Sequence, residues 1–264
     1  MTTTNTDPAF IAEIKDADYR KATGLSQSSL KKFIVQSPAH YLASLEEVQE
    51  PTKAMQFGTA FHANMLASEP TDIYAVKKKV DGRSKEGKLY NETFALENQG
   101  KVIIDEEEHS RIIAMADSMM SHEFAGSAIQ ALTHKEFAVF GTHKGVRLKG
   151  LIDGYNEKEG IVIDLKTAED SSPSGFRKAI WDRAYAIQQV HYTWLLTNAG
   201  KPVNAFYFFA IEKEPPYAVG CYMLTAESLT KSLKVWEEAI ERFAECQTTG
   251  NYPAYSDEVV QITL

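Results

Sequence analysis

Three side chains that could act together lie in the stretch GLIDGYNEKEGIVIDLKTAED, residues 150–170. Two short, mostly apolar β-like runs are joined there by the polar turn NEKEG. Asp153 lies in the first run, and Asp164 and Lys166 lie in the second. Side chains alternate between the two faces of a strand, so Asp164 and Lys166 share one face. A tight hairpin can bring Asp153 beside Asp164, which predicts a site with two carboxylates and one ammonium at one end of a sheet.

The chemistry of such a group follows from its charges. Two ionised carboxylates at close range repel, and burying them is costly unless something compensates the charge. A hard divalent cation does so, and magnesium binds oxygen ligands while it keeps several waters. A metal in this position can activate water and hold a phosphoryl oxygen, and the lysine can neutralise charge on the attacked phosphate. The plainer alternative is an Asp–Lys ion pair at a sheet edge.

Composition sets the broad class of the protein. The chain has 264 residues, 44% of them hydrophobic and 24% charged, which is typical of a globular domain. Its net charge of -8 argues against a general polyanion binder, although a local basic channel can still bind nucleic acid. The two cysteines, Cys221 and Cys246, cannot form a disulfide framework or a four-cysteine metal site. No signal peptide or membrane span is recognisable, so the sequence predicts a cytoplasmic protein.

Helices and strands must position these residues. We predict a helix that follows Leu25 with Ser26 as its N-cap, helical segments over 39–47 and 55–70, and a helix over 107–120 preceded by an Asp105–Glu108 capping box. Residues 77–101 are interpreted as a mobile basic loop that opens into a short helix, and 101–105 as a strand. Further strands are predicted over 133–145, 146–158, 160–167, 204–214 and 217–224. Helices are predicted from 173 to about 198, with a break near 181–182, and over 225–246.

This order of elements predicts an α/β (α+β) fold with a central mixed β-sheet flanked by helices. Residues 1–24 are interpreted as a flexible N-terminal segment, and residues 25–264 as a single domain. The aromatic run Phe206–Phe209 is interpreted as strand core. Taken alone, His62 would be a structural histidine, and the other six histidines lie in no motif and are expected at the surface or in packing contacts.

Five motifs in chain order resemble those of the PD-(D/E)XK nuclease superfamily, in its RecB-like branch. They are LSQSSLKKF at 25–33, the G-x-x-x-H segment 58–62, Asp153, the segment Asp164-Leu165-Lys166, and the Q-x-x-x-Y segment 188–192. Each motif alone is weak, but five in the correct order are specific. Together they are most similar to the C-terminal nuclease domain of RecE (exonuclease VIII) and its phage-encoded relatives. The resemblance extends over about residues 24–250.

The resemblance implies a restriction-endonuclease-like core and a metal site. His62, Asp153, Asp164 and the backbone carbonyl of Leu165 would hold magnesium, for which manganese can substitute. Glu136 on the preceding strand is a weaker candidate for a second metal. The resemblance also raises the question of an iron–sulfur cluster, which some RecB-like nucleases hold with four cysteines; two cysteines exclude it here.

The resemblance also assigns catalytic and DNA-binding roles. Asp153, Asp164 and Lys166 would be catalytic, with Lys166 as the catalytic lysine. Gln188 and Tyr192 lie one helical turn apart, so they would flank the site and contact Lys166 or the DNA backbone. Several basic residues would contact DNA phosphates, although a solvated surface is an equally good interpretation of them: Lys31, Lys32, Arg83, Lys85 and Lys88.

The function implied by the resemblance is that of a magnesium-dependent 5′→3′ exonuclease on double-stranded DNA ends that leaves 3′ single-stranded tails. The implied partner is a RecT-like single-strand annealing protein, and the implied assembly is a homo-oligomeric ring, a trimer or tetramer. The implied setting is a bacterial cell, with a phage or prophage gene as one origin. Two alternatives stay open: a structure-specific or single-strand DNA nuclease of the same fold, and a non-catalytic DNA-binding assembly protein.

Overall fold

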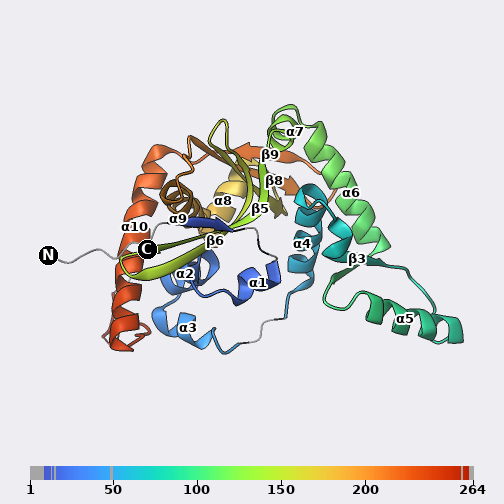
Figure 1. Cartoon of the computed structure of the whole chain (residues 1–264), viewed down its shortest axis with the longest axis horizontal. Helices are drawn as coiled ribbons and strands as arrows, with labels where there is room; N and C mark the ends of the chain where they lie inside the picture. The colour runs from blue at the N-terminus through green and yellow to red at the C-terminus, as the bar shows by residue number, and fades with distance from the viewer. Residues whose placement is uncertain (1–8, 13, 15, 48–49, 257, 262–264) are drawn as a thin grey trace.

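The computed structural model describes residues 9–12, 14, 16–47, 50–256 and 258–261, which form a mixed sheet with helices on both faces (Figure 1). The predicted fold class is confirmed. The strand order is β1-β5-β6-β7-β8-β9, and β2 pairs with β6. The strands are β1 (Phe10–Ala12), β2 (Leu25–Ser26), β5 (His134–His143), β6 (Val146–Asn156), β7 (Ile161–Ala168), β8 (Ala205–Glu212) and β9 (Val219–Tyr222).

The helices begin close to the predicted capping residues. Ser26, Asp105 and Thr225 each cap a helix with the side-chain oxygen, and the Asp105–Glu108 capping box is formed. The predicted break between 173 and 198 occurs at Ala184, whose φ of 54° ends one helix and begins the next. The helices are α1 (Asp16–Lys21), α2 (Gln27–Val35), α3 (Pro38–Ala43), α4 (Lys53–Leu66), α6 (Glu106–Ser121), α7 (Glu123–Gln130), α8 (Pro173–Arg183), α9 (Tyr185–Asn198) and α10 (Ala226–Thr249).

One face of the sheet is covered by α2, α8, α9 and α10. Phe33 of α2, Leu195 of α9 and Trp236 of α10 are buried there against Val162 and Phe208 of the sheet. Because side chains alternate along β7, Asp164 points to the same side as Val162. This face therefore brings the helix that carries Gln188 and Tyr192 over the candidate carboxylate.

The other face of the sheet is covered by α4, α6 and α7. Phe61 of α4, Met115 of α6 and Ile129 of α7 are buried with Leu165 of β7 and Phe209 of β8. Phe206 and Phe208 lie in the core on the first face, and Phe209 lies in the core on this face. The strand-core interpretation of Phe206–Phe209 is therefore confirmed, with Tyr207 alone half-buried. The face brings α4, and with it His62, to the edge of β7.

A second, smaller unit projects from the body. Strands β3 (Tyr74–Lys77) and β4 (Val102–Asp105) form a parallel pair, joined through α5 (Lys85–Glu97) and preceded by the 3₁₀ helix η1 (Pro70–Asp72). We call residues 74–105 the arm. Figure 1 shows α5 directed away from the sheet, and within α5 only Gly87 is buried. The sequence interpretation of 77–101 as a loop with a short helix is wrong for α5, which is 13 residues long.

Some elements were not expected from the sequence. Strand β1 pairs antiparallel with β5, and α1 follows it, inside the segment interpreted as flexible. Residues 1–8, 13 and 15 of that segment lie outside the described residues. Strand β3 and helix α7 were also not predicted, because short elements carry little periodicity. Among the described residues, no helix is both long and apolar enough to cross a bilayer.

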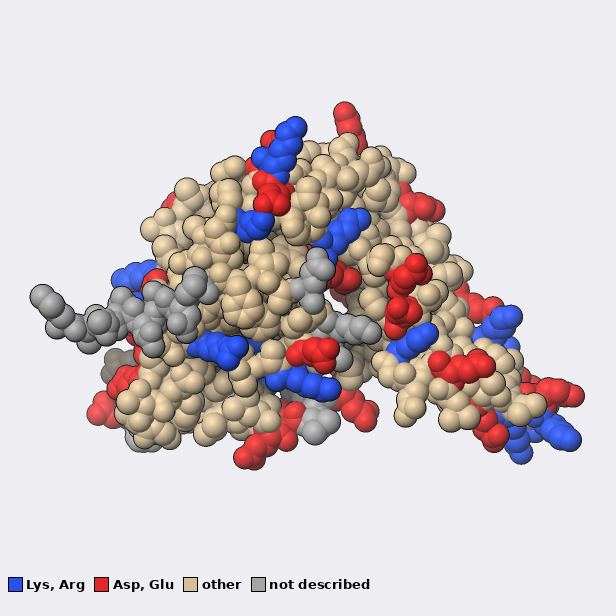
Figure 2. Space-filling view, viewed as in Figure 1, with Lys and Arg blue, Asp and Glu red and all other residues tan. Residues whose placement is uncertain are grey.

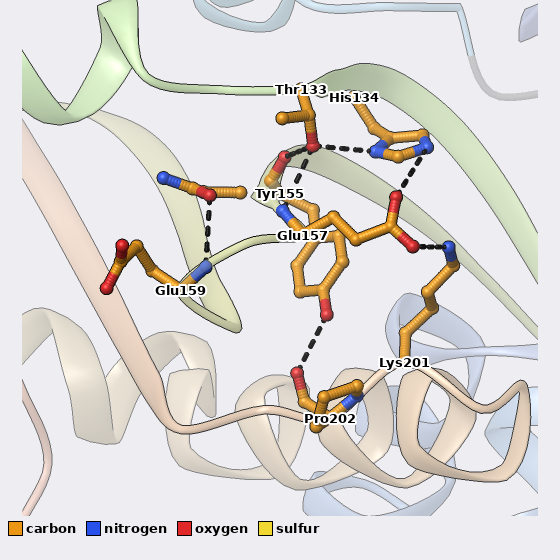
Figure 3. A network of polar contacts seen from close by, with 8 residues as sticks. Thr133, His134, Tyr155, Glu157, Glu159, Lys201 and Pro202 are labelled. Atoms are coloured by element: carbon orange, nitrogen blue, oxygen red, sulfur yellow. Dashed lines mark hydrogen bonds and ion pairs between the residues drawn. The ribbon is translucent and has the colours of Figure 1, made fainter.

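Polar contacts hold the turn end of the β6–β7 hairpin in place (Figure 3). Thr133 Oγ1 donates to the Tyr155 carbonyl at 3.1 Å and accepts from the Glu157 N–H at 3.0 Å. The Tyr155 hydroxyl donates to the Pro202 carbonyl at 2.8 Å, and Lys201 pairs with Glu157. These contacts tie the hairpin to the β5 entry and to the loop before β8. They hold the register that pairs Gly154 with Ile163, directly beside Asp153 and Asp164.

A buried histidine under the sheet makes folding stability depend on pH. His191 donates from Nε2 to the Lys149 carbonyl at 3.0 Å and accepts at Nδ1 from the Trp236 indole N–H at 3.1 Å. Because a carbonyl only accepts and an indole only donates, these partners select the neutral Nε2–H tautomer. Burial lowers the pKa of His191 to about 4, against the opposing effect of the Lys149 carbonyl. This confirms His191 as a packing residue.

We expect His191→Gln to flatten the acid dependence of stability. Between its folded pKa of about 4 and its ordinary value of 6.5, His191 binds more protons in the unfolded chain. Its contribution is therefore complete above 6.5 and is lost as pH falls toward 4. Glutamine can keep both hydrogen bonds without titrating. Urea unfolding at about pH 7 and about pH 4.5 should show the wild type losing about 2–3 kcal/mol more than the variant. Equal losses would contradict the assignment.

Candidate active site

The two aspartates meet where β6 and β7 separate. The backbone pairing of the two strands ends at Gly154 and Ile163. Beyond this pair, the Asp153 carboxylate replaces a backbone carbonyl as the hydrogen-bond acceptor for β7. Its Oδ2 accepts from the Leu165 N–H at 2.8 Å. The hairpin therefore brings Asp153 beside the segment Asp164–Lys166, as the sequence predicts.

Asp164 and Lys166 form a buried ion pair. The Lys166 ammonium pairs with Oδ2 of Asp164, and the Asp164 side chain is only 2% exposed. The second oxygen, Oδ1, accepts a hydrogen bond from the side-chain amide of Gln188. Gln188 also shares a side-chain hydrogen bond with Tyr192. The Q-x-x-x-Y motif thus reaches the site through Asp164, whereas the sequence analysis expected it to contact Lys166 or DNA.

Tyr185 is a site residue that sequence reasoning missed. The Lys166 ammonium lies 4.9 Å from the centre of the Tyr185 ring, a cation–π arrangement. Tyr185, Gln188 and Tyr192 are spaced i, i+3, i+7 on α9, so one helix face carries all three. Extending the Q-x-x-x-Y pattern one turn toward the N-terminus would have found Tyr185.

Close packing positions α9 against β6. A Cβ at Gly150 would lie 2.9 Å from Leu195 Cδ1 and 3.1 Å from a ring carbon of Tyr192. The missing side chain lets the helix backbone approach the strand. This approach places Gln188 within hydrogen-bond reach of Asp164.

His62 reaches the site from α4, on the sheet face opposite α9. Its Nδ1 lies 3.6 Å from Oδ2 of Asp153. Gly58, one turn earlier, faces Thr167 of β7 with no side chain between them. The G-x-x-x-H motif therefore places a small residue against the strand and the histidine beside Asp153. His62 therefore has a polar contact with the site in addition to the packing role that its position on the helix would suggest.

The electrostatics of the four groups are interdependent. Burial, together with the nearby Asp153 carboxylate, raises the pKa of Asp164 to about 6, against the opposing effect of Lys166. Burial would also raise the pKa of Asp153, but His62, Lys166 and the Leu165 N–H outweigh it and hold that pKa below its usual value. Burial would lower the pKa values of Lys166 and His62, but the carboxylates raise both. Burial opposes ionisation of each of the four groups, and the opposite charges of their neighbours favour it.

Comparison with known proteins identifies this fold. Residues 26–263 match the family model described as "PDDEXK-like domain of unknown function (DUF3799)". The chain belongs to this family. A crystal structure of a candidate exonuclease from Eubacterium rectale superimposes with a TM-score of 0.63, covers 96% of both chains and shares 13% sequence identity. A crystal structure of a phage related exonuclease from Haemophilus somnus has a TM-score of 0.39 and 11% identity, and covers 88% of this chain and 99% of that one. A comparison with curated proteins gives no match.

The donor set of this PDDEXK-like domain fits a hard divalent cation that keeps much of its own water. Asp153 and Asp164 supply carboxylate oxygens, and Oδ2 of buried Asp164, although it pairs with Lys166, has no hydrogen-bond partner among the described residues. Within the described residues, no three His, Cys, Asp or Glu side chains converge on one point. Magnesium is commonly held by one or two carboxylates, with waters and substrate completing its shell. The two carboxylates therefore fit a divalent cation that completes its shell with water and substrate.

The remaining predicted metal ligands are less directly placed. Glu136 occupies the β5 position between the pairs Lys135–Gly154 and Phe137–Ile152, opposite Asp153, and has a φ of 46°. Glu136 therefore lies on the strand next to β6, at the same position along the sheet as Asp153. Leu165 contacts Asp153 through its N–H. The roles of Glu136, of the Leu165 carbonyl and of His62 as metal ligands stay predictions.

The predicted DNA-binding lysines and arginines do not form one surface. Arg83, Lys85 and Lys88 lie in the arm, where Figure 2 shows basic and acidic side chains mixed at its outer end. Lys31 and Lys32 are half-buried on α2, on the side of the molecule that carries α9. The structure thus separates the two groups. Of the two, only Lys31 and Lys32 lie on a helix that packs beside α9, which carries Gln188 and Tyr192.

A cavity of about 780 Å³ opens between α1, the N-terminus of α2 and β6, beside Tyr192 of α9. Leu151 and Tyr192 line it, together with Ser26 at the N-terminus of α2 and the basic residues Arg147 and Lys149. Lys149 itself is engaged, since its ammonium donates to the carbonyls of residues 19, 20 and 22 at the end of α1. The cavity therefore shares Tyr192 with the candidate site, while neither aspartate lines it.

Proposed function

We propose that this PDDEXK-like protein is a metal-dependent nuclease that hydrolyses phosphodiester bonds in DNA. The observation that carries the proposal is the buried Asp164–Lys166 pair, with Asp153 beside it at the opening of the β6–β7 hairpin. A purely structural ion pair would not need a second carboxylate whose charge raises the pKa of the first. The Eubacterium rectale protein of the same fold is itself described as a candidate exonuclease.

Each residue of the site has a role in this reaction. Asp153 and Asp164 would hold a divalent cation, which when bound would supply an activated water and hold a phosphoryl oxygen. Lys166, whose ammonium packs over the Tyr185 ring, would neutralise charge that develops on the attacked phosphate. Gln188 holds one oxygen of Asp164 and so orients that carboxylate.

The finer assignment follows the motif resemblance. We propose a 5′→3′ exonuclease on double-stranded DNA ends that produces 3′ single-stranded tails, with magnesium as the physiological metal. A RecT-like annealing protein would bind the exposed strand, and a homo-oligomeric ring would keep DNA near an otherwise acidic chain. The net charge of -8 supports an enclosing assembly, because an open acidic surface would repel DNA.

End-labelled linear duplex DNA tests this function. With magnesium, we expect the 5′ label to be released first as a mononucleotide while the 3′ label stays in long product. A chelator should stop the release. Internal cuts would leave a nuclease but remove the exonuclease assignment, and digestion of single strands alone would favour the single-strand alternative. DNA binding without cleavage in magnesium or manganese would favour the non-catalytic alternative.

His62 should tune the metal requirement. Its contact with Asp153 orients a carboxylate that would bind the cation. We expect His62→Ala to raise the magnesium concentration for half-maximal activity by about 10- to 100-fold, with a smaller change in the maximal rate. A metal titration of initial rates measures both quantities. Since His109 lies near the start of α6 and its ring faces Tyr74 of β3 in the arm, His109→Ala is a suitable control. An unchanged titration for His62→Ala would return His62 to a packing role.

A further inference from the structure

An exposed tryptophan lies on the helix that leads into the site. Trp181 is 82% exposed, the most of any aromatic residue among those described. The other tryptophans differ, since Trp236 is buried and Trp194 is half-buried. Single exposed apolar residues are common on protein surfaces, so the surroundings of the ring decide whether it is a contact site.

Basic side chains accompany this ring on α8. Arg177 and Lys178 precede Trp181 by four and three residues, so they share its helix face, whereas Arg183 follows two residues later and lies on another face of the helix. All three are exposed. The one carboxylate in this stretch is Asp182, also exposed. Within the described part of the chain, none of these cations forms an ion pair with a carboxylate.

A fourth cation comes from α2. Lys31 lies close enough to Arg183 for the two charges to interact, and burial, then Arg183, lowers the pKa of Lys31, with Asp182 opposing. Two cations held together without an ion-pair partner form a place where a phosphate is favourable. Because Lys31 belongs to the LSQSSLKKF motif, this placement also gives that motif a contact near the site.

The platform is close to the catalytic groups. Tyr185, whose ring lies under the Lys166 ammonium, follows Trp181 by four residues, which separates their Cα atoms by about 14 Å at most. That span corresponds to about four stacked nucleotides of one strand. A strand held at Trp181 could therefore continue to the carboxylates.

We propose that Trp181 is a base-stacking platform for an unpaired nucleotide of the DNA strand that enters the site, with Lys31 and Arg183 binding the neighbouring phosphates. The proposal rests on the proposed nuclease function and adds to it the recognition of an unpaired base. A base paired within a duplex hides both of its faces between its neighbours, so only a frayed or single-stranded nucleotide can lie on the ring. The charges favour nucleic acid over an apolar protein partner, since four cations accompany one carboxylate.

Binding in a chelator tests the platform without cleavage. The probes are a single-stranded oligothymidylate of about 12 nucleotides and an abasic strand of the same length and charge. Trp181→Ala should weaken oligothymidylate binding by about 5- to 150-fold and leave abasic-strand binding unchanged. Trp181→Phe should restore most of the affinity. In the wild type, oligothymidylate should quench tryptophan emission more than the abasic strand does, and Trp181→Phe should remove that difference.

Matched controls separate the possible explanations. Tyr255 is another highly exposed aromatic residue, 70% exposed, and Tyr255→Ala should bind like the wild type. Arg183→Gln should weaken both probes equally and lower the salt dependence of binding. Thermal melting of each variant should match the wild type, because these side chains are exposed.

Several outcomes would overturn the platform. Unchanged oligothymidylate affinity in Trp181→Ala, in a protein that still cleaves DNA, removes the platform and leaves the nuclease function standing. Equal loss for both probes means that the ring does not read bases. A change in self-association in Trp181→Ala, with DNA affinity unchanged, would assign the ring to a contact between copies of this chain. A wild type that neither binds nor cleaves DNA removes both proposals.

Discussion

Asp164→Asn should reduce metal-dependent DNA cleavage by about 10³-fold or more. The substitution keeps the size of the side chain, and its oxygen can still accept from Gln188, so the packing of α9 over β7 is preserved. What it removes is the negative charge that would hold the cation and that pairs with Lys166. The loss should therefore appear in the rate and not in the fold.

Initial rates on labelled duplex, measured at saturating magnesium and again at saturating manganese, provide the test. Asp117 on α6 is exposed and lies outside the β6–β7 hairpin, so Asp117→Asn is the matched control and should cleave at the wild-type rate. Circular dichroism of Asp164→Asn should match the wild type, whereas its melting temperature should fall because Lys166 loses its carboxylate. Cleavage within about tenfold of the wild type would exclude Asp164 from the chemistry proposed here.

Removing the partner of this carboxylate should have the largest effect on stability. Lys166→Met leaves Asp164 buried without its ammonium, and breaking a buried pair from one side costs about 3–5 kcal/mol. The methionine keeps a flexible apolar chain near the Tyr185 ring, so little packing is lost. The double variant Lys166→Met/Asp164→Asn removes both charges and should recover the wild-type stability or exceed it by about 1–4 kcal/mol.

Urea unfolding in a chelator at about pH 7.5 compares the wild type, the two single variants and the double variant. The double variant should lack cleavage activity although it is stable, because the charges that cost folding energy are those the reaction needs. A double variant less stable than the wild type would show that the ion pair is a net stabiliser of the fold. In that case the structural interpretation of the pair would be strengthened.

The same reasoning explains which parts of the site were visible in the sequence. Asp153, Asp164 and Lys166 were identified because strand alternation and a short turn are local rules, and the hairpin obeys them. Ser26, Asp105 and Thr225 were found as helix caps for the same reason, since a cap needs only its own first turn. The fold class followed from the order of these elements.

Contacts between distant segments were not visible. The partner of Gln188 is Asp164, and Tyr185 lies under Lys166, because α9 packs on the α2–α10 face of the sheet. Periodicity places residues on a helix face but does not say what that face meets. The basic residues of the arm and of α2 looked alike in sequence, yet the structure separates them, since α5 projects away from the sheet.

By itself, the sequence determined most of the helices and strands, the hairpin that carries two aspartates and a lysine, and the family resemblance. Those depend on neighbouring residues, whose geometry is set by backbone alternation and capping. Only the tertiary structure decided how deeply Asp164 is buried, which groups share its charge, and that Trp181 stays exposed beside unpaired cations. Burial and long-range charge depend on residues far apart in the chain, so no local pattern encodes them.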